Sequence, residues 1–310
     1  MPAKQPYFIV NPEAGSGRSR RLWPDIAAKA KELWGDCNFV FTRKEGDAAR
    51  YARLAAEKGK SWVVAVGGDG TVHEVVNGLM QANVVQKANV LLGIISMGSG
   101  DDFIKSLELP KDPIKALDIL KKKKTKTIDL LRVSYLNHEQ KKESRYSMNL
   151  SDFGLGGKVM QKVNASSKRF GSKLTYLFHS LATFLTFRSF SAVLETEDRN
   201  YHFHYLIMGL VANGKFFGSG MCVAPEAVVD DGWMNVILVE KMGIATFLKM
   251  ISPIYKQEKI ENKSIFRMKA KKMHVQPTSL KPVYIELDGE QPGTLPATFE
   301  LVPQALKLCV

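Results

Sequence analysis

The sequence predicts a two-domain protein, in which a doubly wound α/β/α domain is followed by an antiparallel β-sandwich domain. The chain has 310 residues, of which 45% are hydrophobic, and it is longer than most domains that fold around a single hydrophobic core. Its first part alternates apolar runs with helical patterns, as parallel sheets do. Later segments are short, β-rich and separated by turn residues. A boundary near Thr127–Asp129 gives domains 1–128 and 129–310, and the last few residues are allowed to return to the first domain.

The periodicity of apolar residues places the elements of the first domain. The predicted strands are Tyr7–Val10, Asn38–Phe41, Trp62–Val66 and Val90–Ile95. The predicted helices are Ser19–Trp34, Asp47–Glu57, Val72–Met80 and Pro113–Lys121.

The second domain is predicted to be mainly β-structure. Its strand candidates are Tyr201–Val211, Trp233–Val239, Ile265–His274, Pro282–Leu287 and Ala297–Val302. The helical exceptions are Phe170–Phe190 and Ile244–Ile251. The first of these is apolar, aromatic and flanked by basic residues, so it fits either an interfacial membrane helix or a helix packed on the sandwich.

Three glycine-containing loops follow three predicted strands of the first domain. They are Asn11–Arg18, Gly67–Thr71 and Ser96–Phe103. In doubly wound sheets, ligands bind outside the carboxyl ends of the strands. We therefore expect the three loops to line one crevice.

The loop Gly67–Thr71 gives the strongest signal. Glycines between a buried strand and a helix start bring backbone N–H groups close to an anion, and the helix dipole favours negative charge there. Asp69 would repel phosphate, so it is expected to act with a metal ion or a substrate hydroxyl. Thr71 and Glu74 have the spacing of a capping box.

The other two loops carry weaker signals. The first loop lacks the Gly-Lys-Ser/Thr ending of a P-loop, so Gly15 and Gly17 fit either a tight turn or phosphate contact. The third loop offers the Ser99 hydroxyl, followed by Asp101 and Asp102 at a helix start. Capping explains one of these acids, and the second exceeds what a cap needs.

Taken together, the motifs resemble the diacylglycerol kinase catalytic-domain family, which includes bacterial lipid kinases, sphingosine kinases and ceramide kinases. The resemblance covers nearly the whole chain and is greatest to the soluble bacterial members. The motifs that carry it are Asn11-Pro12, Gly67–Gly78, Gly98–Phe103, Asn213–Gly220, Ala224–Ala227, Asp231-Gly232 and Leu287–Glu290.

The resemblance implies a fold and a set of site residues. The first domain would be similar to NAD kinase and phosphofructokinase, with the active site in a cleft between the two domains. ATP would bind at Asn11, Thr42, Gly67, Gly68, Asp69, Gly70, Thr71, Val72, His73, Glu74 and Ser99. The catalytic residues would be Glu290 as general base, with the acids Asp69, Asp102 and Asp129. A structural Mg²⁺ would be held by Asp231 and by the carbonyl groups of Val228 and Trp233.

Two positions depart from the family pattern. Asp101 stands where the family usually has asparagine, which puts an extra negative charge near the phosphates or could place a second magnesium ion. Asn235 stands where an aspartate is usual. From the residues alone, Leu287–Glu290 reads as a hairpin turn, because Asp-Gly is a strong turn signal.

The resemblance favours an ATP- and Mg²⁺-dependent lipid kinase that converts diacylglycerol to phosphatidic acid. One alternative is an NAD kinase or another small-molecule kinase, although the Asn-Glu pair of NAD kinases is absent from the second half of the sequence. Another alternative is a non-catalytic regulator that binds lipid or nucleotide.

The charge and the cysteines indicate a location and partners. The net charge of +13 suits transient contact with anionic lipid, and no nucleic-acid reader motif accompanies it. Three scattered cysteines fit a reducing cytoplasm, without disulfides or a zinc site. We expect a cytoplasmic protein, peripheral at the inner membrane face, whose lipid substrate lies at the membrane surface. The oligomeric state stays open, with a dimer as one option.

Overall fold

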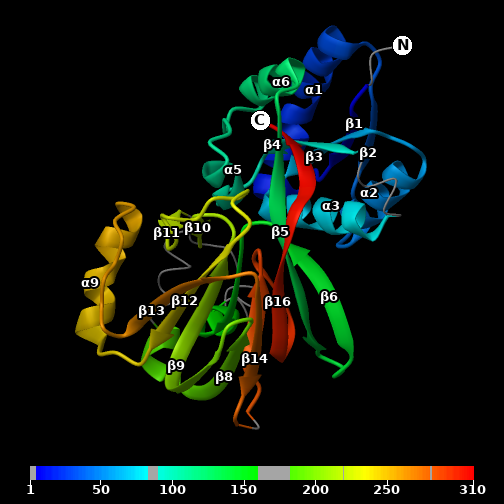
Figure 1. Ribbon diagram of the computed structural model, residues 1–310. Coiled ribbons are helices and arrows are strands. Elements are labelled where there is room, and N and C mark those ends of the chain that lie inside the picture. The colour runs from blue at the N-terminus through cyan, green and yellow to red at the C-terminus, as the bar shows by residue number, and fades with distance from the viewer. Residues whose placement is uncertain (1–4, 83–89, 160–181, 219, 280) are drawn as a thin grey trace. The chain divides into compact units, whose positions relative to one another are not determined.

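The computed structural model describes residues 5–82, 90–159, 182–218, 220–279 and 281–310 (Figure 1). The chain forms two compact units. Unit 1 comprises Met1–Ile128 together with Gln304–Val310, and unit 2 comprises Asp129–Pro303. Each unit has its own hydrophobic core.

Unit 1 is built on a parallel sheet with the strand order β2-β1-β3-β4. The strands are β1 (Tyr7–Val10), β2 (Asn38–Phe41), β3 (Trp62–Gly67) and β4 (Leu91–Ser96). The end of β16 (Glu290–Cys309) adds a further parallel strand, in which Lys307 pairs with Leu91 of β4. The order reverses between β1 and β3, where doubly wound sheets bind their ligands.

Helices cover both faces of this sheet, as predicted (Figure 1). They are α1 (Ala14–Trp34), α2 (Asp47–Glu57), α3 (Asp69–Gln81), α5 (Asp102–Ser106) and α6 (Pro113–Lys122). On one face, α1 and α6 pack on alternate strand residues such as Phe8 and Val64, while α2 packs against α3. Residues 15–17 have positive φ angles, so the regular part of α1 begins after Gly17.

Unit 2 is an antiparallel β-structure, as predicted. Its strands are β5 (Thr125–Asn137), β6 (Lys142–Ser147), β7 (Leu150–Gly154), β8 (Phe190–Thr196), β9 (Asn200–Ala212), β10 (Phe216–Phe217), β11 (Met221–Cys222), β12 (Met234–Glu240), β13 (Ile265–Ala270), β14 (Lys272–Pro277), β15 (Tyr284–Leu287) and β16. The long strands β9 and β16 change neighbours along their length: β9 pairs with β8, β7 and β12, and β16 pairs with β15 and β14. These shared strands join the layers around one core.

The sequence misplaced some elements of unit 2. The sequence predicts Ile265–His274 as one strand, but the strand is interrupted at Lys271. It forms β13 and β14, which pair with different neighbours. The predicted helix at Ile244–Ile251 is present as α9 (Ile244–Tyr255). Most of the predicted helix Phe170–Phe190 lies outside the described residues. In its described part, residues 182–186 are helical, and Phe190 already belongs to β8.

The three cysteines Cys37, Cys222 and Cys309 are free thiols. Among the described residues, no helix is both long enough and apolar enough to cross a membrane.

Candidate functional site

The three glycine loops of unit 1 lie against one another, as predicted. The Asn11 side-chain amide donates a hydrogen bond to Thr71 Oγ1 at 3.0 Å, which ties the first loop to the second. A Cβ on Gly15 would collide with the carbonyl oxygen of Met97, and one on Gly68 would lie 3.3 Å from the Gly98 Cα. Backbone therefore meets backbone at the carboxyl ends of β1, β3 and β4, next to the reversal in strand order.

The predicted capping box at Thr71 and Glu74 is wrong. Helix α3 begins at Asp69 instead, which puts Thr71 inside the first turn. Thr71 accepts from Asn11, and Glu74 Oε2 accepts from the backbone N–H of Ala48 at 3.0 Å, so Glu74 links α3 to α2.

No described side chain caps the start of α3. The first N–H groups of a helix have no intrahelical partner, so they can bind an anion.

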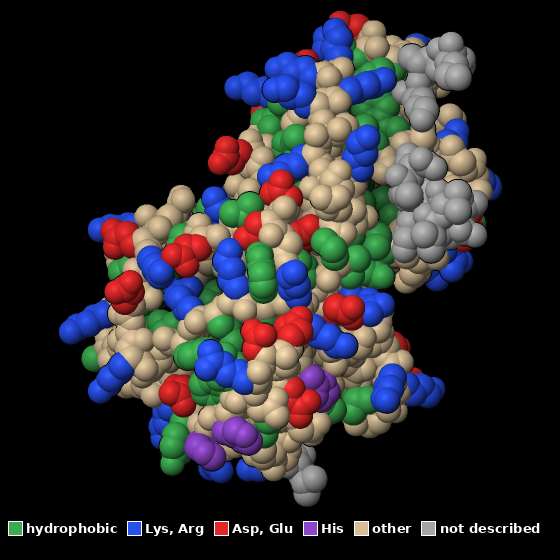
Figure 2. Space-filling view, in the orientation of Figure 1, with side chains coloured by type: hydrophobic (Ala, Val, Ile, Leu, Met, Phe, Trp, Pro, Cys, Tyr) green, Lys and Arg blue, Asp and Glu red, His purple; other side chains and the backbone are tan. Residues whose placement is uncertain are grey.

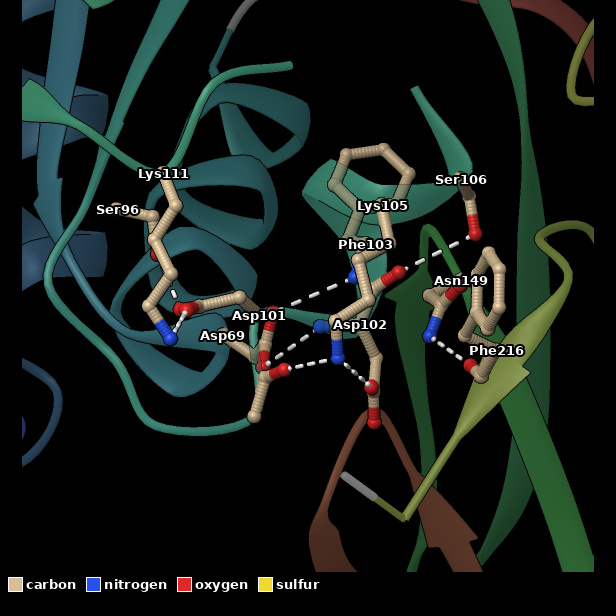
Figure 3. A network of polar contacts seen from close by, with 11 residues as sticks. Asp69, Ser96, Asp101, Asp102, Phe103, Lys105, Ser106, Lys111, Asn149 and Phe216 are labelled. Carbon is tan, nitrogen blue, oxygen red and sulfur yellow. Dashed lines mark hydrogen bonds and ion pairs between the residues drawn. The ribbon is translucent and has the colours of Figure 1, made fainter. Parts of the chain in front are cut away.

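Three carboxylates gather beside this helix start (Figure 3). Asp69 accepts long hydrogen bonds from the backbone N–H groups of Asp102 (3.3 Å) and Phe103 (3.5 Å). Burial raises the pKa of Asp69 to about 6, and the negative charges of Asp102 and then Asp101 add to this rise. Asp69 therefore lies among like charges, which is the electrostatic setting in which a carboxylate binds a cation.

The structure explains how the chain accommodates Asp101 where the family usually has asparagine. This residue is buried and has a left-handed φ of 56°, a conformation that both Asn and Asp tolerate. Its carboxylate accepts from the Ser96 hydroxyl and lies 2.6 Å from Lys111 Nζ (Figure 3). Lys111 therefore balances the charge that this chain adds at the position, and neighbouring Asp102 has its own cation in Lys105 at 3.1 Å.

Other predicted ATP-binding residues fall into two groups. Val72 and His73 point into the packed side of α3, where both side chains are buried and the Asn77 amide lies 3.3 Å from His73 Nε2. Ser99 is exposed, and Thr42 donates its backbone N–H to Val10 at the end of β1. For Val72 and His73, only the backbone remains as a candidate for ligand contact.

In unit 2, the Leu287–Glu290 segment is a two-residue hairpin turn, as the residues alone suggest. Leu287 pairs with Glu290, and Asp288 and Gly289 have φ angles of 49° and 96°, as a type I′ turn requires. The Asp288 carboxylate accepts four hydrogen bonds, from the Ser147 hydroxyl and the backbone N–H groups of residues 148, 149 and 150, at 2.8–3.1 Å. Asp288 therefore stabilises the turn.

Glu290, the predicted base, has a partner that sequence reasoning missed. Arg145 on β6 lies 3.0 Å from Glu290 Oε2. The two residues are 145 positions apart, and no local motif marks Arg145 in the sequence.

Asp129 belongs to unit 2 and organises the loop of the predicted structural magnesium. It is buried, its carboxylate accepts from the Gly232 N–H at 2.8 Å, and its own N–H donates to the Val229 carbonyl. Asp231 accepts from the Trp233 N–H and lies 2.8 Å from Lys269 Nζ. This carboxylate already has a cation, so the donors fit a magnesium ion poorly, and the predicted ion at Asp231, Val228 and Trp233 stays a prediction.

Among the described residues, no three His, Cys, Asp or Glu side chains form a group that could hold a metal ion by themselves. The structure brings Asp69, Asp101 and Asp102 together in unit 1, and it gathers Asp288 and Glu290 at a turn of unit 2. The cleft that would bring Glu290 to Asp69 stays a prediction.

Comparisons with known proteins agree with these motifs. Residues 5–133 match the model of the diacylglycerol kinase catalytic domain, and residues 150–310 match the YegS C-terminal NAD kinase beta sandwich-like domain. The chain belongs to the diacylglycerol kinase catalytic-domain family. Membership supports a kinase-type enzyme and implies a nucleotide phosphate donor.

Similar proteins span the full length of this family member. A diacylglycerol kinase of Staphylococcus carnosus is 26% identical over 305 residues, which cover 98% of this chain and 94% of that protein. A diacylglycerol kinase from Staphylococcus aureus strain MRSA252 is 27% identical over 96% of this chain and 89% of that protein. A solved diacylglycerol kinase structure from Bacillus anthracis str. Sterne has a TM-score of 0.74 at 22% identity, over 99% of this chain and 96% of that one, which shows a common fold.

Proposed function

We propose that this protein is an ATP- and Mg²⁺-dependent lipid kinase that phosphorylates the free hydroxyl of diacylglycerol and forms phosphatidic acid. The observation that carries the proposal is the carboxylate cluster of Asp69, Asp101 and Asp102 beside the uncapped start of α3. The names of the relatives supply the lipid class.

The phosphates of ATP have a natural place at the start of α3. Backbone N–H groups and the positive end of the helix dipole favour anions there, and the loops of β1 and β4 lie alongside. The Gly67–Thr71 loop contains no P-loop lysine, so backbone dipoles and a cation must provide most of the positive field.

The donor set fits a magnesium ion carried by ATP. Asp69 would hold it, because this carboxylate is crowded by like charges and oxygen ligands suit the ion. Asp102 would join it by exchanging Lys105 for the ion. When bound, the ion would neutralise charge on the transferring phosphoryl group.

The transfer itself needs a proton acceptor. In our proposal the substrate hydroxyl oxygen forms a bond to the γ-phosphorus, the bond from that phosphorus to the bridging oxygen breaks, ADP leaves, and Glu290 takes the hydroxyl proton. Arg145 orients the carboxylate by holding Oε2. Residues of both units must then act on one substrate, so variants in either unit should abolish transfer.

A lipid kinase must also reach a bilayer, and helix α9 offers a surface for this. Its apolar stripe runs along one helix face at the spacing i, i+4, i+7, i+11 and consists of exposed Ile244 and Leu248 and half-buried Ile251 and Tyr255. Ile244 and Leu248 are 37% and 47% exposed. Two exposed basic residues accompany the stripe: Lys249 lies within α9 and Lys256 caps its end. Helices that lie in an anionic membrane surface carry basic residues in this way. Basic side chains are otherwise spread over the face shown in Figure 2, so charge alone does not locate this surface.

The activity test is a labelled-ATP assay against a lipid panel and NAD, with and without Mg²⁺. We expect label in phosphatidic acid. Label in NADP alone would instead support a nucleotide kinase, and no transfer to any acceptor would support a binding regulator. Glu290→Gln should keep nucleotide binding and lose turnover, whereas the exposed control Glu195→Gln should change neither. Full activity of the Glu290 variant would contradict the assigned base.

The membrane test is co-sedimentation with phosphatidylglycerol vesicles. Leu248→Ser should weaken binding several-fold, and Ile114→Ser on α6, where the apolar residue is 37% exposed against 47% for Leu248, should not. Equal binding by both variants would exclude α9, and a Leu248 effect on self-association instead would mark a surface for a second copy.

A further inference from the structure

Two carboxyl groups face each other beneath the turn that carries Glu290. Asp152 on β7 and Glu286 on β15 are direct cross-strand partners in the antiparallel register. Both are 0% exposed. No motif in the sequence points to either residue, and the proposed phosphoryl transfer does not use them.

Within the described part of the chain, two backbone N–H groups donate to the four carboxyl oxygens of this pair. The Gly157 N–H donates to Asp152 Oδ1 at 2.9 Å, and the Gly289 N–H donates to Glu286 Oε1. The remaining oxygens, Asp152 Oδ2 and Glu286 Oε2, are buried and accept no hydrogen bond from the described residues. Burying a carboxylate whose oxygen has no donor is strongly unfavourable, and burying two such carboxylates side by side is more unfavourable still.

Among the described residues, the groups around the pair give its two remaining oxygens no hydrogen-bond donor. A Cβ on Gly156 would collide with the Asp152 carboxyl group, so the backbone closes one side of it. The charged group that faces Glu286 from the same turn is Asp288, which is negative and adds repulsion. Arg145 is engaged with Glu290, and Lys158 lies over the Tyr284 ring.

We propose that a single proton, shared between Asp152 and Glu286, positions the turn that places Glu290. The link is short: Glu286 holds the N–H of Gly289, and Glu290 is the next residue. Asp152 and Glu286 are therefore positioning residues, and the assignment rests on the proposed function of Glu290.

The electrostatics agree with this geometry. Burial raises the pKa of Asp152 to about 6. Burial, and then the charge of Asp152, raise the pKa of Glu286 well above its usual range. The folded protein thus binds more protons here than the unfolded chain, so the contribution of the pair to stability is full at acid pH and is lost as pH rises through the folded pKa values.

The decisive comparison is between Glu286→Gln and Glu286→Ala. The glutamine can accept from Gly289 through its oxygen and donate to Asp152 through its nitrogen, so it reproduces the shared-proton arrangement without a titratable group. We expect the wild-type protein to lose kcat at alkaline pH as the shared proton dissociates, and we expect Glu286→Gln to keep kcat at neutral pH and to lack this alkaline fall. Glu286→Ala should lower kcat by about 10²-fold because the turn shifts, with little change in KM for ATP.

An infrared measurement tests the proton independently of catalysis. The wild-type protein at neutral pH should show the carbonyl stretch of a protonated carboxylic acid, and Glu286→Gln should lack that band while the control Glu195→Gln keeps it. An unchanged band in Glu286→Gln, or a glutamine variant as inactive as the alanine variant, would overturn the proposal. Asp152→Asn provides a second test if the alanine variant does not fold, because its amide can donate to Glu286 and should likewise remove the band and the alkaline fall. If no lipid is phosphorylated at all, the proposed function fails, while the infrared comparison still decides whether the proton is present.

Discussion

The same dipeptide, Asp-Gly, follows a buried strand in each unit, and the two aspartates have opposite surroundings. Asp288 in unit 2 accepts four hydrogen bonds of ordinary length. Asp69 in unit 1 accepts two long ones and faces two further carboxylates. A carboxylate with its full set of donors stabilises a fold, whereas one crowded by like charges costs energy that a bound cation would recover.

The first prediction concerns Asp288 and should give the largest effect. Asp288→Ala leaves four donors without their acceptor, and we expect a loss of about 3 kcal/mol or more in the free energy of unfolding. Urea denaturation measures this. The control Asp198→Ala, at an exposed turn, should stay within about 0.5 kcal/mol of wild type. A small loss at Asp288 would show that its hydrogen bonds contribute little.

Asp69 should behave in the opposite way. Asp69→Asn removes a crowded charge, so we expect transfer to fall by about 10²-fold while the protein becomes about 1 kcal/mol more stable at pH 8. Because the folded pKa of Asp69 is raised to about 6, its contribution to stability is lost as pH rises through that value, and the advantage of the variant should vanish near pH 4.

The measurements for Asp69 are kinetics with labelled ATP and urea unfolding at both pH values. The exposed control Asp25→Asn should change neither quantity. A variant that is both active and less stable would mean that Asp69 has the structural role assigned to Asp288.

Lys111 sharpens the comparison within unit 1. Lys111→Gln leaves the buried Asp101 carboxylate with the Ser96 hydroxyl as its partner. We expect the free energy of unfolding to fall by about 1 kcal/mol and the affinity for ATP to weaken several-fold. The double variant Lys111→Gln/Asp101→Asn should restore both, because the uncompensated charge is gone. A double variant no better than the single one would contradict the charge argument.

The smallest expected effect concerns Asp231. If Lys269 occupies the place of a cation there, Mg²⁺ should raise the Tm of Lys269→Gln more than that of the wild-type protein. Thermal unfolding with increasing Mg²⁺ measures this, and Lys272→Gln is the control. Equal rises of Tm in all three proteins would show that Lys269 does not compete with Mg²⁺ for Asp231.

The sequence predicted most of unit 1 because its strands and helices carry strong apolar periodicity. It found the helix α3 but failed at its start, because the cap spacing of Thr71 and Glu74 is a local signal, while their actual partners, Asn11 and Ala48, lie on other elements. Strand β6 escaped prediction since its sequence, KESRYS, has no apolar alternation.

The candidate site divides in the same way. The glycine loops and Asp69 are visible as motifs, since their chemistry is local. Arg145, Lys111 and the pair of Asp152 with Glu286 acquire meaning only through contacts between distant segments. A buried glutamate looks like a surface residue until the structure shows what covers it.

The last strand has a consequence for dissecting the molecule. Residues 304–310 complete the sheet of unit 1, where Leu308 is fully buried, although β16 begins in unit 2. A fragment that ends at Ile128 would leave one edge of β4 bare and open to pairing with other chains. Neither half can therefore be excised by a single cut, and the nucleotide-binding half proposed here is whole only when the far end of the polypeptide has returned to it.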